Sequence, residues 1–132
     1  MNWRYRSERY KIKDYWNNLT GVDFENKIAD LFTGIGYRVK KTPRSNDGGI
    51  DLYLTGKNKQ KIAVQCKRYA QRVATHHIRE FIGALKSNDL DTALFVTIKG
   101  VTEPARTLAH QNNIKIWTLD DIMNEVVSLK EK

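Results

Sequence analysis

The chain has a single cysteine, Cys66, only two prolines, and no run of apolar residues long enough to cross a membrane. One cysteine excludes an intramolecular disulfide and any zinc site built from several cysteines. A membrane-spanning helix needs about 18 or more consecutive apolar residues, and the first residues of the chain are too polar for a secretory signal. We therefore expect a cytoplasmic protein with no membrane association, in which Cys66 packs as a small buried hydrophobe.

The composition is that of one ordinary globular domain: 40% of the 132 residues are apolar and 29% are charged. The net charge is +8, and its excess is local, because residues 38–72 hold ten lysines and arginines against only Asp47 and Asp51. The rest of the chain sums to zero. A positive field concentrated in one segment attracts polyanions and makes their binding salt-dependent. A nucleic acid is therefore the expected partner.

Residues 50–67 have the pattern of a β-hairpin, because apolar and polar residues alternate with a period of two in both arms. The apolar positions, expected on one face of a half-buried hairpin, are Ile50, Leu52, Leu54, Ile62, Val64 and Cys66. Residues 56–60 supply the turn between the arms. If these five residues form the loop, Asp51 lies opposite Gln65 on the neighbouring strand.

This register places a carboxylate, an amide and an ammonium group on one face. The Cβ atoms of Asp51 and Gln65 would lie roughly 5 Å apart, with Lys67 about 7 Å further along the strand. Carboxylate and amide oxygens suit Mg²⁺ or Mn²⁺, and a bound cation lowers the pKa of a coordinated water. Lys67 can position or deprotonate that water, or stabilise charge on a phosphate. The hairpin therefore predicts a metal-dependent site for phosphodiester hydrolysis.

Each of the three residues also has an ordinary structural interpretation. Asp51 follows two glycines, as a turn residue does. Gln65 is compatible with a polar position on an edge strand, and Lys67 with a lysine that protects such an edge from pairing. It is their combination on one predicted face that favours a site.

Helical periodicity predicts a helix over residues 22–33, with Thr20 as its N-cap. Glu25 lies at the margin of the apolar stripe of this helix. It is either an acid of the site or a first-turn glutamate that complements the helix dipole, and the pattern leaves both open. The other expected elements are strands over 37–41, 92–97 and 114–118, and helices over 75–86, 102–111 and 120–129. Their order predicts an α/β fold with a mixed central β-sheet flanked by helices.

Basic and polar residues near the hairpin are candidate DNA contacts. They are Arg44, Asn46, Lys67, Arg68, Arg72 and His77. His77 follows His76 in the first turn of a predicted helix, where a surface or DNA-contacting role is favoured over metal binding. Residues 1–20 form a basic, aromatic arm preceding a domain over 21–132. The arm either stacks on nucleic acid, packs on the protein or contributes to a dimer contact, and the sequence leaves these alternatives open.

Three runs resemble the catalytic domain of Mrr-like restriction endonucleases, a branch of the PD-(D/E)xK nuclease superfamily. They are Gly21-Val-Asp-Phe-Glu25, Asn46-Asp-Gly-Gly-Ile-Asp51 and Val64-Gln-Cys-Lys67. The resemblance implies a restriction-endonuclease-like fold and a metal-dependent endodeoxyribonuclease. The roles that it implies are Asp51 as principal metal ligand, Gln65 in a position usually held by an acid, Lys67 as catalytic lysine and Glu25 as the helix-borne acid.

Two other functions are compatible with the sequence. A Holliday-junction resolvase would share the superfamily fold and the small basic chain. A DNA-binding module that has lost catalysis would bind DNA without binding a metal. Because a chain with one site needs two copies to cut both strands, we also expect a homodimer.

Overall fold

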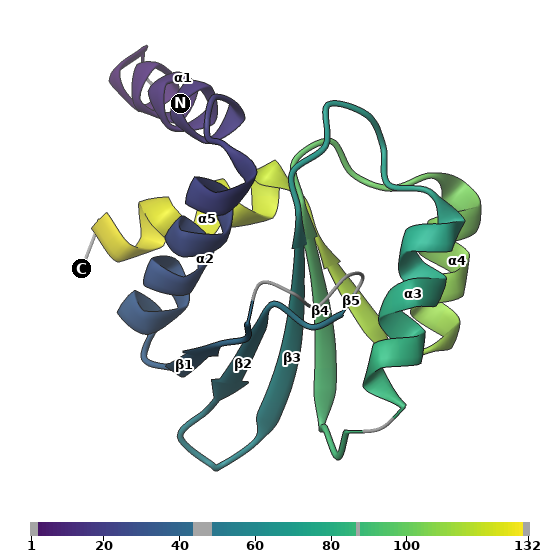
Figure 1. Ribbon diagram of the computed structural model, residues 1–132. Helices are drawn as coiled ribbons and strands as arrows, with labels where there is room; N and C mark the ends of the chain where they lie inside the picture. Colours follow the sequence, from purple (N-terminus) through teal and green to yellow (C-terminus); the bar gives the residue numbers. More distant parts are fainter. Residues whose placement is uncertain (1–2, 44–48, 87, 131–132) are drawn as a thin grey trace.

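The computed structural model describes residues 3–43, 49–86 and 88–130, which form one β-sheet with helices on both of its faces (Figure 1). The elements in chain order are α1 (Trp3–Asn17), α2 (Gly21–Ile35), β1 (Arg38–Lys41), β2 (Leu52–Thr55), β3 (Lys61–Lys67), α3 (Thr75–Leu85), β4 (Thr92–Thr97), α4 (Glu103–Gln111), β5 (Ile114–Trp117) and α5 (Leu119–Lys130). The predicted α/β fold with a mixed sheet is confirmed.

The strands are ordered β1-β2-β3-β4-β5 across the sheet. β1, β2 and β3 pair antiparallel, whereas β3, β4 and β5 pair parallel. The carboxyl ends of the three parallel strands therefore meet at one edge of the sheet, at the top of Figure 1. Ligand sites of open α/β sheets commonly form at such an edge.

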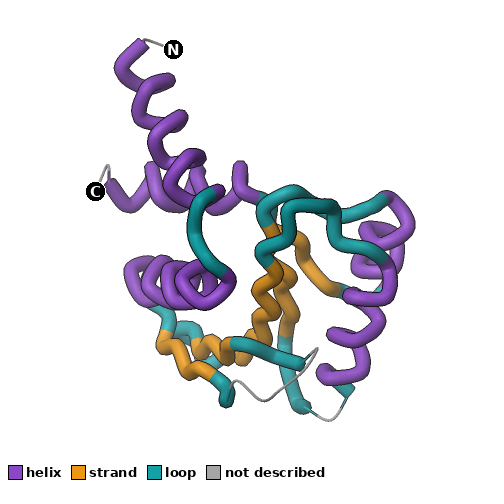
Figure 2. Tube along the Cα trace, turned by 45° about the horizontal axis from the view of Figure 1, so that its top comes forward, coloured by secondary structure: helices purple, strands orange, loops and turns teal. Residues whose placement is uncertain are grey.

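Each face of the sheet carries its own hydrophobic core. α1, α2 and α5 cover one face, where Phe24 and Met123 are fully buried, and α3 and α4 cover the other, where Phe81 and Phe95 are fully buried (Figure 2). β3 contributes to both cores through Val64 and Ala63. The hairpin is therefore not half-buried as predicted, because its second arm is a central strand covered on both sides.

The predicted hairpin register is confirmed. Thr55 pairs with Lys61 and Leu52 pairs with Val64, so residues 56–60 form the loop. The loop is closed by the Gly56 N–H, which donates to the Gln60 carbonyl at 3.0 Å. A Cβ atom at Gly56 would lie 2.4 Å from the end of the Gln60 side chain, so a larger residue there would have to displace that side chain.

One position of the hairpin differs from its prediction. Ile50 packs with Phe81 and Phe95, on the face opposite that of Leu52. The strict alternation that predicted otherwise begins only at Leu52, where β2 starts. Before that point the chain is held by two backbone bonds, from the Asp51 N–H to the Val64 carbonyl at 2.8 Å and from the Thr42 N–H to the Asp51 carbonyl at 3.0 Å.

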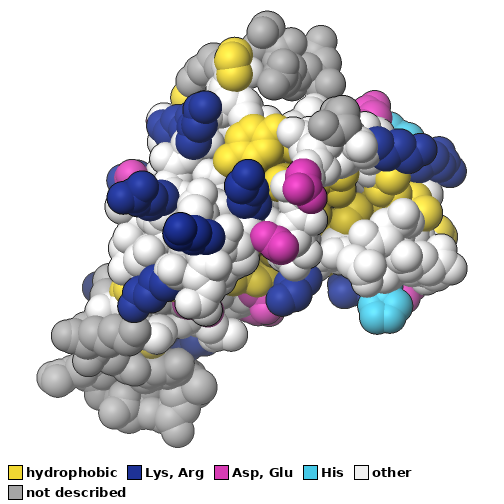
Figure 3. Space-filling view, turned by 90° about the horizontal axis from the view of Figure 1, so that it is seen from below, with side chains coloured by type: hydrophobic (Ala, Val, Ile, Leu, Met, Phe, Trp, Pro, Cys, Tyr) yellow, Lys and Arg dark blue, Asp and Glu magenta, His cyan; other side chains and the backbone are white. Residues whose placement is uncertain are grey.

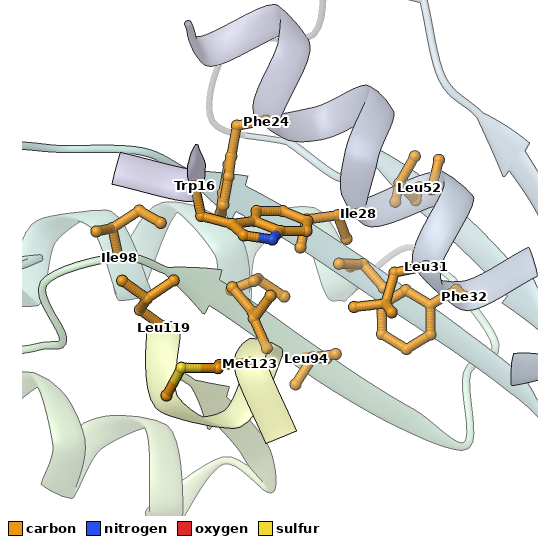
Figure 4. Packing of buried hydrophobic residues seen from close by; sticks show 14 of the residues in the cluster. Trp16, Phe24, Ile28, Leu31, Phe32, Leu52, Leu94, Ile98, Leu119 and Met123 are labelled. Atoms are coloured by element: carbon orange, nitrogen blue, oxygen red, sulfur yellow. The ribbon is translucent and has the colours of Figure 1, made fainter. Parts of the chain in front are cut away.

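The sequence left the role of the amino-terminal segment open. In the structure this segment contains the helix α1, which packs on the core shared with α2 and α5. Ile12 and Trp16 of α1 lie four residues apart, on one side of the helix, and are only 7% and 5% exposed. Figure 4 shows Trp16 beside Phe24 and Ile28, and its ring is edge-on to Phe24 with centroids 6.0 Å apart. α1 is thus anchored to this core by Ile12 and by the larger side chain of Trp16.

Replacing Trp16 with alanine is expected to lower the free energy of unfolding by about 3–5 kcal/mol, because it removes a buried aromatic side chain and leaves a cavity. Urea unfolding followed by circular dichroism measures this change. Tyr10→Ala is the matched control, since Tyr10 is on the same helix but is 72% exposed, and it should change stability by no more than about 0.5 kcal/mol. Equal stability of the two variants would contradict the packing of α1 on the core.

Candidate active site

A hollow of about 370 Å³ opens where the carboxyl end of β3 meets the start of α2 and the residue before β2. We call it the β3 hollow. Its lining residues are Gly21, Val22, Glu25, Thr42, Pro43, Asp51, Cys66, Lys67, Arg68 and Tyr69. Three of the four predicted catalytic residues, Asp51, Lys67 and Glu25, therefore line one space, and the fourth, Gln65, touches Asp51 from the strand beneath.

Asp51 is fixed by two hydrogen bonds from β3. Its Oδ2 atom accepts from the Cys66 N–H at 2.7 Å and from Gln65 Nε2 at 3.2 Å. The contact with Gln65 follows from the predicted register. The bond from the backbone of Cys66 was not predicted, and side-chain alternation gives no signal for it, because any residue carries that N–H group.

The environment of Asp51 raises the pKa of its carboxyl group above the ordinary value. Burial is the largest cause, and the Cys66 N–H, the positive charge of Lys67 and the Gln65 amide oppose it. Ionised Asp51 is therefore less stable here than in water, despite its partners. A bound cation would offset that cost by favouring the charged carboxylate.

This shift predicts how the stability of the metal-free protein depends on pH. Because the native pKa of Asp51 is raised, the stabilising contribution of its protonated form is complete below the unfolded pKa of about 3.9 and is lost as the pH rises through the native value. In EDTA at neutral pH, Asp51→Asn should therefore melt at a higher temperature than the wild type. Thermal melts between about pH 4 and pH 8 should show this difference shrinking toward the acid end; a lower melting temperature of the variant at pH 7 would contradict the raised pKa.

Gln65 is a buried polar residue, only 2% exposed, on a strand that is otherwise apolar at its centre. Its Nε2 atom donates to Asp51, whereas its Oε1 atom is buried and has no hydrogen-bond partner in the described part of the chain. A buried amide oxygen without a partner costs free energy. Gln65 therefore holds an unused oxygen beside a carboxylate, which is the kind of donor that a hard cation accepts.

Glu25 reaches the β3 hollow from the first turns of α2. The helix begins as predicted: Thr20 is its N-cap, with Oγ1 accepting from the Asp23 N–H at 3.2 Å. After burial, the negative charges of Asp51 and Glu25 are what raise the pKa of the Cys66 thiol. The charges of both carboxylates thus reach the Cys66 thiol, although the role of Glu25 in the site stays a prediction.

Lys67 stands at the end of β3 beside an aromatic side chain. Its Nζ atom lies 5.9 Å from the centre of the Tyr69 ring, and that ring lies 4.9 Å from the ring of His77. Tyr69 was not among the predicted site residues. The period of two that placed Lys67 on its face would also have placed Tyr69 there, so the signal was present in the sequence.

The candidate DNA contacts lie in different surroundings. Arg44 and Asn46 are outside the described residues. The Arg68 guanidinium donates to the carbonyl of Asn17, the last residue of α1, so it contacts the protein and ties α1 to β3. Arg72 is exposed and lines a separate hollow, described below.

His77 has a structural contact at the start of α3. Its Nδ1 atom accepts from the Ala74 N–H at 3.2 Å, so in the neutral ring the proton is on Nε2. Burial and then the neighbouring His76 lower the pKa of His77, which favours that neutral form. His77 therefore helps to begin the helix, and a DNA contact through Nε2 stays a prediction.

The described residues contain no cluster of three or more histidine, cysteine, aspartate or glutamate side chains of the kind that binds a metal ion. A cation in the β3 hollow would therefore depend on two carboxylates and the Gln65 amide, with water completing its coordination. In the same residues, every helix is too short or too polar to span a membrane.

Comparison with known proteins places the chain among nucleases. A family model described as "Restriction endonuclease" (Mrr_cat) matches residues 16–126. The type IV methyl-directed restriction enzyme EcoKMrr of Escherichia coli K12 is 30% identical over 93 residues, which cover 65% of this chain and 31% of the relative. The chain thus spans about a third of the length of this relative.

Two solved structures share the fold at low identity. The DNA modification-dependent restriction endonuclease AspBHI superposes with a TM-score of 0.70 at 18% identity, covering 93% of this chain and 35% of that one. The restriction endonuclease MspJI, solved in complex with a 27-mer oligonucleotide, superposes with a TM-score of 0.61 at 14% identity, covering 91% of this chain and 30% of that one. The predicted restriction-endonuclease-like fold is confirmed.

Proposed function

Because the chain belongs to the Mrr catalytic-domain family of restriction endonucleases, we propose that it is a metal-dependent endodeoxyribonuclease that hydrolyses phosphodiester bonds of DNA. One observation carries the proposal. Asp51, Glu25 and Lys67 line the β3 hollow together, and Asp51 Oδ2 lies 3.2 Å from Gln65 Nε2. The net charge of +8 supports a polyanionic substrate.

The residues present are compatible with a divalent cation. Asp51 Oδ2 and the Gln65 amide nitrogen are 3.2 Å apart, and carboxylate and amide oxygens are donors that Mg²⁺ accepts. A rotation of the Gln65 amide would put its unpartnered Oε1 atom next to the carboxylate instead. Asp51, Gln65 and Glu25 would then hold Mg²⁺ or Mn²⁺, with Asp51 as principal ligand.

When bound, such a cation lowers the pKa of a coordinated water and stabilises the charge that develops on the phosphate. The protein's own contribution is to hold the reacting groups in place. The Lys67 ammonium can donate to a phosphate oxygen or orient the attacking water. Asp51, which lines the β3 hollow, is held in place by the Cys66 N–H.

Cutting both strands requires two sites, so we propose that the protein acts as a homodimer. The cleavage products of supercoiled plasmid distinguish this arrangement. Two sites engaged together give linear DNA early in the reaction, whereas a single site gives nicked circles that become linear only after a second, independent event.

Incubation with supercoiled plasmid in Mg²⁺, Mn²⁺ or EDTA, beside a synthetic four-way junction, tests the proposal. We expect nicking or linearisation of the plasmid in either metal and none in EDTA. Symmetrical cuts confined to the junction would instead identify a Holliday-junction resolvase. Salt-sensitive DNA binding without cleavage of either substrate would favour a module that has lost catalysis.

A further inference from the structure

A second hollow, of about 440 Å³, lies at the carboxyl ends of β3, β4 and β5. We call it the strand-end hollow. It is lined by residues that directly follow β4 and β5, by Arg72 from the segment after β3, and by Lys13 of α1. It therefore lies at the same edge of the sheet as the β3 hollow, on the side of β4 and β5.

The charge of the strand-end hollow is predominantly positive. Its charged side chains are Lys13, Arg72, Lys99, Arg106, Glu103 and Asp120. Lys13 and Asp120 neutralise each other, with Nζ and Oδ1 3.3 Å apart. The cations that are left, Arg72, Lys99 and Arg106, are exposed and make no side-chain ion pair or hydrogen bond with the residues that the structure describes.

Backbone hydrogen bonds hold together the segments that carry Arg72 and Lys99. Val73 forms an isolated parallel bridge with Val101, in which the Val73 N–H donates to the Gly100 carbonyl at 2.9 Å and the Thr102 N–H donates to the Val73 carbonyl at 2.9 Å. Val73 and Val101 are themselves buried. The segments that carry Arg72 and Lys99 are thus tied to each other beside the start of α4, where Arg106 follows.

We propose that the strand-end hollow binds a backbone phosphate of the same DNA strand that is cut in the β3 hollow. Three cations against one remaining carboxylate, Glu103, leave this polar concavity with a net positive charge that matches a phosphodiester, and arginine in particular binds phosphate oxygens in pairs. Neighbouring strands are about 4.8 Å apart, so the carboxyl ends of β3 and β5, which border the β3 hollow and the far side of the strand-end hollow, are separated by about 10 Å. A DNA strand presents one phosphate per about 3.4 Å of helix axis, so the second phosphate lies within about three nucleotides of the cut.

This inference rests on the proposed nuclease function, and it adds a direction: the DNA strand runs along the carboxyl-terminal edge of the parallel strands, from Asp51 toward α4. A substrate must therefore continue past the scissile phosphate on that side. The opposite end of the sheet, around the hairpin loop, is also basic and is the face seen in Figure 3. Its exposed cations include Arg38, Lys57 and Lys61, which provide a control of equal charge.

The test compares two triple variants, Arg72→Gln/Lys99→Gln/Arg106→Gln and Arg38→Gln/Lys57→Gln/Lys61→Gln. Binding of a 30-base-pair duplex is followed by fluorescence anisotropy in EDTA, over a range of salt concentrations. For the first variant we expect at least tenfold weaker binding and a decrease of about 1 in the steepness of the slope of log K against log salt, since one lost phosphate contact removes about one. The second variant should lose less than about threefold.

Equal losses in the two variants would overturn the inference, because they would show only the effect of net charge. The inference would also be overturned if inorganic phosphate or a mononucleotide bound in the strand-end hollow while the first variant bound the duplex as tightly as the wild type does. In either case wild-type plasmid cleavage would persist and the proposed function would stand. If the wild type neither binds nor cuts DNA, the proposed function fails, and the inference with it.

Discussion

Replacing Asp51 with asparagine is expected to slow metal-dependent DNA cleavage by about 10³-fold or more. The substitution keeps the shape of the side chain and one acceptor for the Cys66 N–H, but it removes the charge that would hold the cation. Loss of a metal-based stabilisation of several kcal/mol, here taken as about 4 kcal/mol, corresponds to about 10³ in rate at 1.36 kcal/mol per factor of ten. The initial rate of plasmid cleavage at saturating Mg²⁺ measures the effect.

The control for Asp51→Asn is Asp30→Asn. Asp30 is an exposed aspartate on α2, outside the β3 hollow, so its substitution removes one negative charge without touching the site. Its cleavage rate should stay within about twofold of the wild type, because the surface potential changes only slightly. If Asp51→Asn folds and retains more than a tenth of wild-type activity, Asp51 is not the principal metal ligand.

Replacing Lys67 with methionine is expected to reduce cleavage by about 10²- to 10³-fold, the usual effect of removing a group that donates to developing charge or transfers a proton. Methionine preserves most of the apolar stem that lies beside Tyr69. The fall should appear in kcat more than in KM, because Lys67 is proposed to act on the reacting phosphate or water. Single-turnover cleavage of a short duplex separates the two quantities.

Lys67→Arg distinguishes the two proposed roles of the lysine. Arginine keeps the positive charge but cannot act as a base near neutral pH. Activity within about tenfold of the wild type would indicate that Lys67 stabilises charge or orients water, whereas a loss equal to that of Lys67→Met would indicate proton transfer. Lys61→Met, an exposed substitution at the other end of β3, is the matched control. If Lys67→Met cleaves as fast as this control, Lys67 has no role in the reaction.

The parts of the site that follow from local rules were predictable. The loop over residues 56–60 determined the hairpin register, and the register brought Asp51 to Gln65. Periodicity and a capping threonine located α2, which carries Glu25. These features depend on residues close in sequence or on the geometry of one strand pair, so the sequence contains the information that they need.

Features that depend on packing between distant segments were not predictable. Ile50 departs from the alternation because the chain enters β2 through bonds to Thr42 and Val64. Among the residues of α1 whose side chains the structure describes, the buried apolar ones are Ile12 and Trp16, too few for a recognisable stripe, and the position of the helix is set by α2 and α5. Arg68 contacts the end of α1 because tertiary structure brings an unpaired helix carbonyl to it.

The most direct test of the account is the binding of Mn²⁺ followed by electron paramagnetic resonance, in which the signal of free Mn²⁺ falls as the ion is bound. Wild type and Asp51→Asn would be titrated side by side, each with a short duplex present. The account predicts at least one bound Mn²⁺ per chain in the wild type and a loss of that binding in the variant. Equal binding by the two proteins would contradict it, because the cation would then be held somewhere other than at Asp51 and Gln65.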